Sequence, residues 1–99
     1  MEQFIYVLVN ANSEIIYCGV SKDLDTRVRR HRRAMKDSSL KILMVSVVWH
    51  SDPLGMELRW INLLLNEGHP LKNKHFRRIP EIEFEDAERS QYVTLTKRI

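Results

Sequence analysis

The N-terminal part of the chain holds two short apolar runs with a polar turn between them. Residues 4–9 and 15–20 are rich in β-branched and aromatic side chains, a composition typical of strands. The small polar residues at 10–13 form a turn cluster, so we expect the two runs to pair as a hairpin. In the register of a four-residue loop, Tyr6 faces Tyr17 on one side of the sheet.

The middle of the chain predicts two helices with a third strand between them. Ser21 is the expected N-cap of the first helix, whose apolar stripe opens three residues later and which ends at residues 37–39. Residues 41–49 are almost continuously apolar, which is typical of a central strand covered on both faces. The second helix begins after Asp52 and stops at Gly68.

The C-terminal residues follow a different pattern. Glutamates alternate with Ile82 and Phe84 over residues 81–85, which predicts a strand or an extended arm. The run at residues 92–96 has the composition of a further short strand.

The predicted element order is β-β-α-β-α, followed by a C-terminal extension. This order indicates an α+β fold, a mixed α/β sandwich in which a small, mainly antiparallel three-stranded sheet has flanking helices. A chain of 99 residues and 11.8 kDa has room for one core. We therefore expect a domain at residues 1–79 and an acidic extension at residues 80–99 that packs on it.

Charge and composition narrow the function classes. The net charge is +3, but residues 1–79 carry +5 and residues 80–99 carry −2, so the basic body favours polyanionic partners. Cys18 is the only cysteine, which excludes an intrachain disulfide and favours a reducing, cytoplasmic setting. The apolar runs are too short to span a bilayer and no secretory signal is evident, so no membrane partner is expected.

Glu57 is the most informative residue of the second predicted helix. At 100° per residue it lies in the middle of an apolar face, close to Trp60 and Ile61. Arg59 and Asn62 mark the expected solvent side. Because a buried carboxylate is costly unless it is paired, Glu57 is either half of a salt bridge to a residue such as Arg27, or a metal ligand or catalytic acid.

Other polar side chains lie in similar apolar surroundings. His31 lies in the apolar stripe of the first helix, and Arg27 borders that stripe one turn earlier. Taken alone, His31 would be a hydrogen-bonded core residue, and Tyr6 and Tyr17 would be aromatic core residues. Together with Glu57 they form a polar group inside a small core, which favours a functional role.

These residues resemble a known family. Phe4-Ile5-Tyr6 and Tyr17-Cys18-Gly19 resemble the paired GIY and YIG motifs of the GIY-YIG nuclease superfamily. The resemblance covers residues 4–73 and continues through residues 21–24, Arg27, His31, Glu57 and Asn73. Phe4 stands where the first motif has glycine, and Cys18 stands where the second has isoleucine.

The resemblance implies a metal-dependent endonuclease that hydrolyses DNA phosphodiester bonds. The hydroxyl of Tyr6 or Tyr17 would deprotonate a water for in-line attack, and Arg27 would neutralise transition-state charge. His31 would bond to a tyrosine or relay the proton. Glu57 would hold one Mg²⁺ or Mn²⁺ ion, and Asn73 would position the Glu57 region or a substrate phosphate.

Specificity must then come from the domain itself or from a protein partner, and homodimers are open. The expected phosphate contacts are basic residues of the first helix region and of the segment after the second helix: Lys22, Arg30, Arg32, Arg33, Lys72 and Lys74. RNA is not excluded as a substrate. The alternative function is a catalytically silent regulator that keeps the fold and binds nucleic acid or protein.

Overall fold

A computed structural model describes residues 2–48 and 51–99. The elements in chain order are β1 (Phe4–Val9), β2 (Ile15–Ser21), α1 (Leu24–Ala34), β3 (Lys41–Val47), α2 (Pro53–Asn66) and α3 (Asp86–Lys97). The three strands form one antiparallel sheet in the order β2-β1-β3. The predicted fold class, an α+β sandwich with a three-stranded antiparallel sheet, is confirmed.

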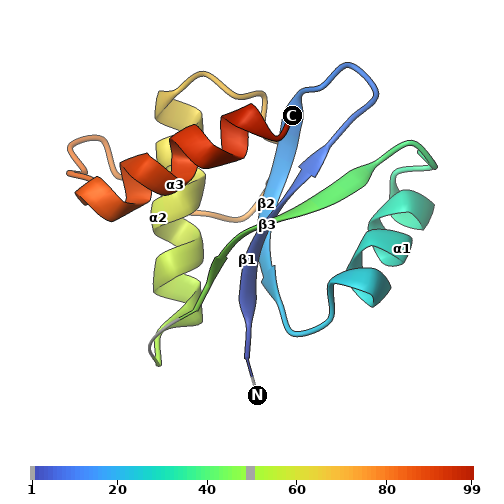
Figure 1. Cartoon of the computed structure of the whole chain (residues 1–99), viewed down its shortest axis with the longest axis horizontal. Coiled ribbons are helices and arrows are strands. Elements are labelled where there is room, and N and C mark those ends of the chain that lie inside the picture. The colour runs from blue at the N-terminus through green and yellow to red at the C-terminus, as the bar shows by residue number, and fades with distance from the viewer. Residues whose placement is uncertain (1, 49–50) are drawn as a thin grey trace.

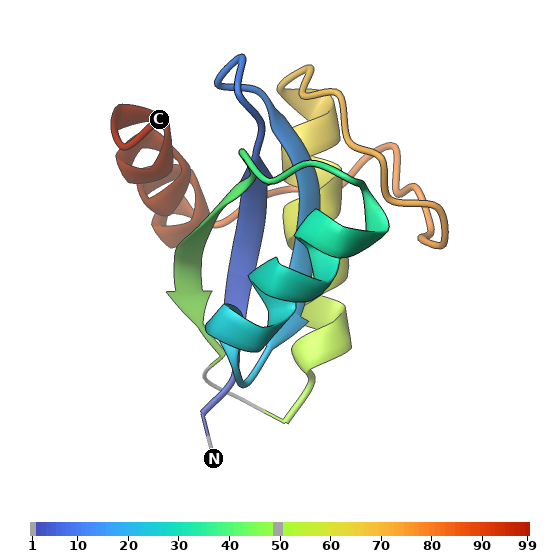
Figure 2. The ribbon, with the colours of Figure 1, turned by 90° about the vertical axis from the view of Figure 1, so that its right-hand side faces the viewer.

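Helices cover both faces of the sheet. Figure 1 shows α1 on one side of the strands and α2 with α3 on the other, and the turned view of Figure 2 shows the same arrangement. Side chains of β1 alternate between the two layers, because successive strand residues point to opposite faces. Ile5 and Val7 pack against α2 and α3, whereas Tyr6 and Leu8 pack against α1.

β1, and not the third strand, occupies the centre of the sheet. From Ile5 to Val9 every residue of β1 is buried, whereas β3 is a partly exposed edge strand whose Met44 is 38% exposed. The expectation of a central third strand is therefore wrong, because its apolar residues pack under α1 and α3 at the sheet's edge. The predicted strand also reached Trp49, which lies outside the described residues.

The hairpin register differs from the predicted one. Tyr6 pairs with Gly19 and Leu8 pairs with Tyr17, because the connection is longer than four residues and the register shifts between Leu8 and Val9. This shift is a β-bulge, in which Ile16 is the extra residue of β2. Without the extra residue, Tyr17 would pair with Val7 and face α2. The bulge thus turns Tyr17 to the α1 side, where Tyr6 lies.

The first helix has its N-cap two residues later than expected. Asp23, not Ser21, is the N-cap, and its side chain accepts a hydrogen bond from the Thr26 N–H at 3.1 Å. Ser21 ends β2 and accepts a hydrogen bond from the Asp23 N–H, so it supports the cap. The helix ends at Ala34 with Met35 as its C-cap, before the predicted end at residues 37–39.

The second helix matches its predicted limits, but its expected solvent side is covered. Asn62 is 1% exposed and bonds to the backbone of Leu58, Arg77 and Ile79. Arg59 forms an ion pair with Glu88 at 2.6 Å. The prediction that these two residues face solvent is wrong, because the C-terminal segment packs over them.

That segment contains a helix at residues 92–96, where a short strand was expected, because these residues belong to α3. Residues 81–84 form no strand, and Phe84 packs against the core, which fits the extended arm that was the other alternative. The buried Leu95 and the partly buried Tyr92 are three residues apart and reach the same core, which fits one helix face and not a strand. Glu88 accepts a hydrogen bond from the Glu85 N–H at 2.8 Å and so stabilises the first turn. Within the described residues, no helix is long and apolar enough to cross a membrane.

The hydrogen bonds of Asn62 give a prediction for stability. Asn62→Ala should lower the free energy of unfolding by roughly 2–3 kcal/mol, because the Ile79 N–H and the Arg77 carbonyl lose a buried partner. Urea unfolding measures this change. Asn66→Ala, at the exposed end of the same helix, is the matched control and should have little effect. Equal effects of the two substitutions would contradict the structural role of Asn62.

Candidate active site

Two tyrosines and a histidine form a cluster between β1, β2 and α1. The Tyr6 hydroxyl lies 2.8 Å from His31 Nε2. The Tyr17 ring stacks on Tyr6 with centroids 6.2 Å apart, and its centroid lies 4.6 Å from that of His31. Tyr6 is 1% exposed, whereas Tyr17 and His31 are partly buried. The structure thus brings together three of the predicted site residues.

Gly19 makes this cluster sterically possible. A Cβ atom at this position would lie 2.6 Å from the Tyr6 hydroxyl oxygen and 3.0 Å from a ring carbon of Tyr17. Any larger residue would displace the tyrosines from α1. The close packing of the two tyrosines therefore explains why the second motif has glycine at position 19.

Arg27 and Glu57 act electrostatically on the same cluster. Burial raises the pKa of Glu57, while the Val20 backbone N–H and then the Arg27 charge oppose the rise. Within the described residues the only ion pair is Arg59–Glu88. Arg27 therefore acts on Glu57 through its charge and not through a direct ion pair.

The tyrosines and His31 have shifted proton affinities. Burial and then the neighbouring Tyr17 raise the pKa of Tyr6, against the Arg27 charge. Burial and then the charges of Arg27 and Arg30 lower the pKa of His31. His31 is therefore neutral near pH 7, so that Nε2 can accept the Tyr6 hydroxyl proton when the ring proton is on Nδ1.

Asn73 bonds to the backbone of β2. Its side-chain oxygen accepts a hydrogen bond from the Cys18 N–H at 3.1 Å, and its side-chain nitrogen donates to the Cys18 carbonyl at 2.8 Å. Because Cys18 lies between Tyr17 and Gly19, this pair of bonds holds the strand that carries both. The amide of Asn73 is thereby committed to the strand.

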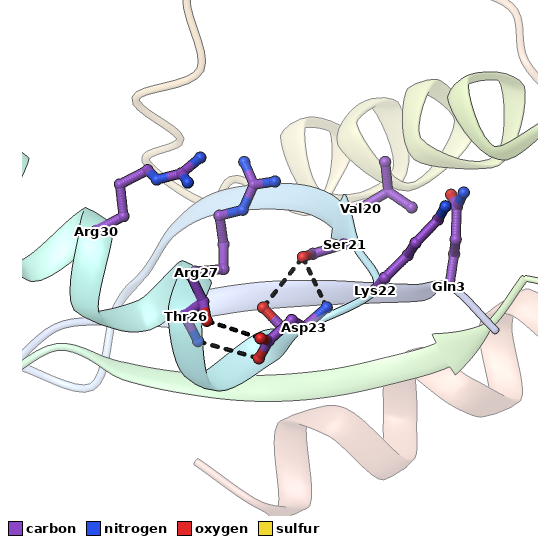
Figure 3. Close-up of a pocket in the computed structure, with 8 residues that line it drawn as sticks. All are labelled: Gln3, Val20, Ser21, Lys22, Asp23, Thr26, Arg27 and Arg30. Atoms are coloured by element: carbon purple, nitrogen blue, oxygen red, sulfur yellow. Dashed lines mark hydrogen bonds between the residues drawn. The ribbon is translucent and has the colours of Figure 1, made fainter. Parts of the chain in front are cut away.

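A cavity of about 380 Å³ adjoins the cluster at the start of α1. Figure 3 shows Arg27 and Arg30 projecting from the same side of α1, with Lys22 and Gln3 across from them. The hydrogen bonds among Ser21, Asp23 and Thr26 form its polar floor. The remaining lining residue is Val20. No sequence motif indicated that Gln3 would line the cavity. Gln3 directly precedes β1, so its position depends on where that strand begins in the sheet.

The other predicted phosphate contacts lie elsewhere. The Arg32 side chain donates to the Leu40 carbonyl at 2.9 Å and so connects α1 to the start of β3. Arg33, Lys72 and Lys74 are exposed and do not line the cavity. The backbone N–H of Lys72 donates to the Ile16 carbonyl of β2 at 2.7 Å.

The donor set suits a hard cation that keeps most of its waters. Within the described residues, no group of three or more His, Cys, Asp or Glu side chains could enclose a metal ion. Glu57 offers carboxylate oxygens, the ligands that Mg²⁺ prefers, and one carboxylate with water and phosphate oxygens is a usual Mg²⁺ environment. The residues present therefore fit a single ion of this kind at Glu57.

Comparison with known protein families identifies the family of the chain. The family model of the GIY-YIG catalytic domain matches residues 2–92, nearly the whole chain. The chain belongs to the GIY-YIG family. It therefore has a nuclease-type catalytic domain, for which nucleic acid is the general substrate class. No curated protein and no solved structure gives a match.

The family match is longer than the motif resemblance. It continues past Asn73 and into α3, whereas the motifs run from residue 4 to residue 73. Residues 82–92 thus lie within the GIY-YIG match, and Phe84 and Tyr92 pack against the core.

The close approach at Gly19 gives a test of the cluster. Gly19→Ala should lower the free energy of unfolding by roughly 1–3 kcal/mol, because the new methyl group overlaps the Tyr6 hydroxyl. In a Tyr6→Phe background the cost should be smaller, since the hydroxyl oxygen is gone. Urea unfolding of the four proteins measures the difference. The same cost in both backgrounds would contradict the contact.

Proposed function

We propose that this GIY-YIG domain is a metal-dependent endonuclease that hydrolyses phosphodiester bonds in DNA. The observation that carries the proposal is the hydrogen bond between the Tyr6 hydroxyl and His31 Nε2, with Arg27 and Glu57 acting on the same cluster. The site thus combines a proton donor, a proton acceptor, a permanently charged cation and a carboxylate. These are the groups that in-line hydrolysis of a phosphodiester requires.

Tyr6 acts as the general base in this proposal. Its hydroxyl passes a proton to His31 Nε2 while its oxygen takes a proton from the attacking water. Burial makes a free phenolate costly, so the neutral acceptor beside it supports a coupled transfer. Tyr17 stacks on Tyr6 and has the more exposed ring, which supports a role in orienting the water or the substrate.

Arg27 and Glu57 act on the phosphate. The guanidinium of Arg27 stabilises the charge that builds on the phosphoryl oxygens as the water oxygen attacks and the bond to the 3′ oxygen breaks. Glu57 holds a divalent cation, Mg²⁺ or Mn²⁺, in reach of the substrate. When bound, this ion supplies Lewis-acid stabilisation of the leaving oxygen.

Asn73 and the basic surface support the same function indirectly. The two bonds of Asn73 to Cys18 support a positioning role through the strand that carries Tyr17. Exposed cations such as Arg33, Lys72 and Lys74 suit contacts with the DNA backbone beyond the site. The single buried thiol of Cys18 suits the cytoplasmic setting expected for the enzyme.

Removal of the Glu57 carboxylate tests the metal role. Glu57→Gln should lower Mg²⁺- or Mn²⁺-dependent cleavage of supercoiled plasmid by on the order of 10²–10³ or more, because the cation site is lost. The thermal unfolding midpoint should stay the same or rise, since a partly buried charge is removed.

Glu67→Gln at the exposed C-cap of α2 is the matched control and should cleave like the parent. Equal cleavage by Glu57→Gln and the parent would refute the metal role. A parent protein that binds DNA but does not cleave it with either cation would refute the nuclease itself.

The proton relay predicts the acid side of the pH profile. The pKa of His31 lies below its ordinary value of 6.5, so His31 remains an acceptor until the pH falls below that value. The cleavage rate should then fall by about tenfold per pH unit as His31 gains its proton. Glu57, whose pKa is raised above 4.5, adds a second loss on the acid side.

A rate profile between about pH 5 and 8 measures these limbs. In His31→Gln the rate should be lower throughout, and only the limb of Glu57 should remain. An unchanged two-limb profile in that variant would show that His31 is not the proton acceptor.

A further inference from the structure

The cavity at the start of α1 shares one residue with the reactive cluster. Arg27 lines the cavity, and its charge also acts on Tyr6, His31 and Glu57. The cavity therefore lies beside the proposed cleavage site, with Arg27 between them. At about 380 Å³ it is within the size range of sites that bind small groups.

The positive charges around the cavity form no ion pair in the described part of the chain. Lys22, Arg27 and Arg30 line the cavity (Figure 3), and no hydrogen bond joins their side chains to a described residue, although the charge of Arg27 also acts on the Glu57 carboxylate. Three like charges that converge on one space repel each other unless an anion joins them. This arrangement favours an anionic ligand.

The one acidic residue in the lining is already engaged. Asp23 Oδ1 accepts the Thr26 N–H at 3.1 Å, and Asp23 Oδ2 accepts the Thr26 hydroxyl proton at 2.7 Å. These two bonds commit its carboxylate to the N-terminus of α1. The net character of the cavity is therefore cationic.

The lining also indicates which part of a nucleic acid enters. Val20 is its single apolar residue, and it has no aromatic side chain on which a base could stack. The Gln3 amide and the three cations are hydrogen-bond donors that suit phosphate oxygens. The cavity is suited to a phosphate and not to a base.

We infer that this cavity binds a backbone phosphate next to the one that is hydrolysed, with Lys22, Arg30 and Gln3 as its ligands and Arg27 between the two phosphates. The inference rests on the proposed nuclease function for its substrate, but the anion site itself does not require cleavage. Because it contacts the backbone alone, this site strengthens binding equally for every sequence.

The test compares two neighbouring arginines of α1. Arg30 lines the cavity, whereas the exposed Arg29 does not. Labelled DNA duplexes of two unrelated sequences are titrated without divalent cations over a range of salt concentrations. Arg30→Ala should weaken binding of both duplexes by roughly 3- to 10-fold and make the log–log salt slope shallower by up to about 0.9, the value for loss of one whole phosphate contact. Arg29→Ala should change the slope less, and Lys22→Ala should behave like Arg30→Ala.

A second arm uses inorganic phosphate and isotope-labelled protein. Saturable shifts of backbone amide signals at residues 20–30 are expected for the parent and weaker binding for Arg30→Ala. Equal salt slopes for Arg29→Ala and Arg30→Ala, or no saturable phosphate binding by the folded parent, would overturn the inference. If Arg30→Ala weakened binding to one of the two duplexes only, the inference that the cavity contacts the backbone alone would be overturned.

The two proposals fail separately in these experiments. If the parent binds phosphate as expected but does not cleave DNA with either cation, the nuclease proposal fails and the anion site stands. If it cleaves DNA but Arg30→Ala binds both duplexes like the parent, the anion site fails and the nuclease stands.

Discussion

The free edge of β2 is the constraint on which the rest of the site depends. An edge strand leaves backbone donors and acceptors unpaired along one side, and they need partners. In this protein the partners come from α2 and the segment after it. The Lys72 N–H bonds to the Ile16 carbonyl, and the Asn73 side chain bonds to the Cys18 backbone. Two residues further along the same edge, the Val20 N–H holds the pKa of Glu57 down against the effect of burial. These interactions fall on every second residue of β2, so the edge aligns α2 and the segment after it with the strand, and the Glu57 charge acts on Tyr17.

The candidate active site and the larger apolar core lie on opposite faces of the same sheet. The larger apolar cluster lies between the sheet and α2 with α3, and includes Trp60 and Leu64. The face toward α1 has a smaller cluster, of which Tyr6 is itself a member. The hydroxyl that we propose as the general base is thus held by core packing, which gives it a defined position and raises its pKa.

Much of the site could be predicted because its polar residues break an apolar pattern. Glu57, Arg27 and His31 were identified in this way, and the structure places their charges or side chains around one cluster. The covered side of α2 could not be predicted from its own periodicity. Asn62 and Arg59 have polar partners that come from 15 and 29 residues away, and only tertiary packing brings them near. The same packing makes a helix of residues 92–96, whose β-branched composition favours a strand.

The bulge at Ile16 makes the register of Tyr17 and Gly19 independent of the length of the hairpin turn. Upstream of it, the exposed turn at residues 11–13 could gain or lose residues, and neither tyrosine would change the face on which it lies. Between Ile15 and Tyr17 the residue count is fixed, because a single insertion or deletion there would move both Tyr17 and Gly19 to the opposite face. A change between Tyr17 and Gly19 would separate the glycine from the tyrosine rings that it accommodates.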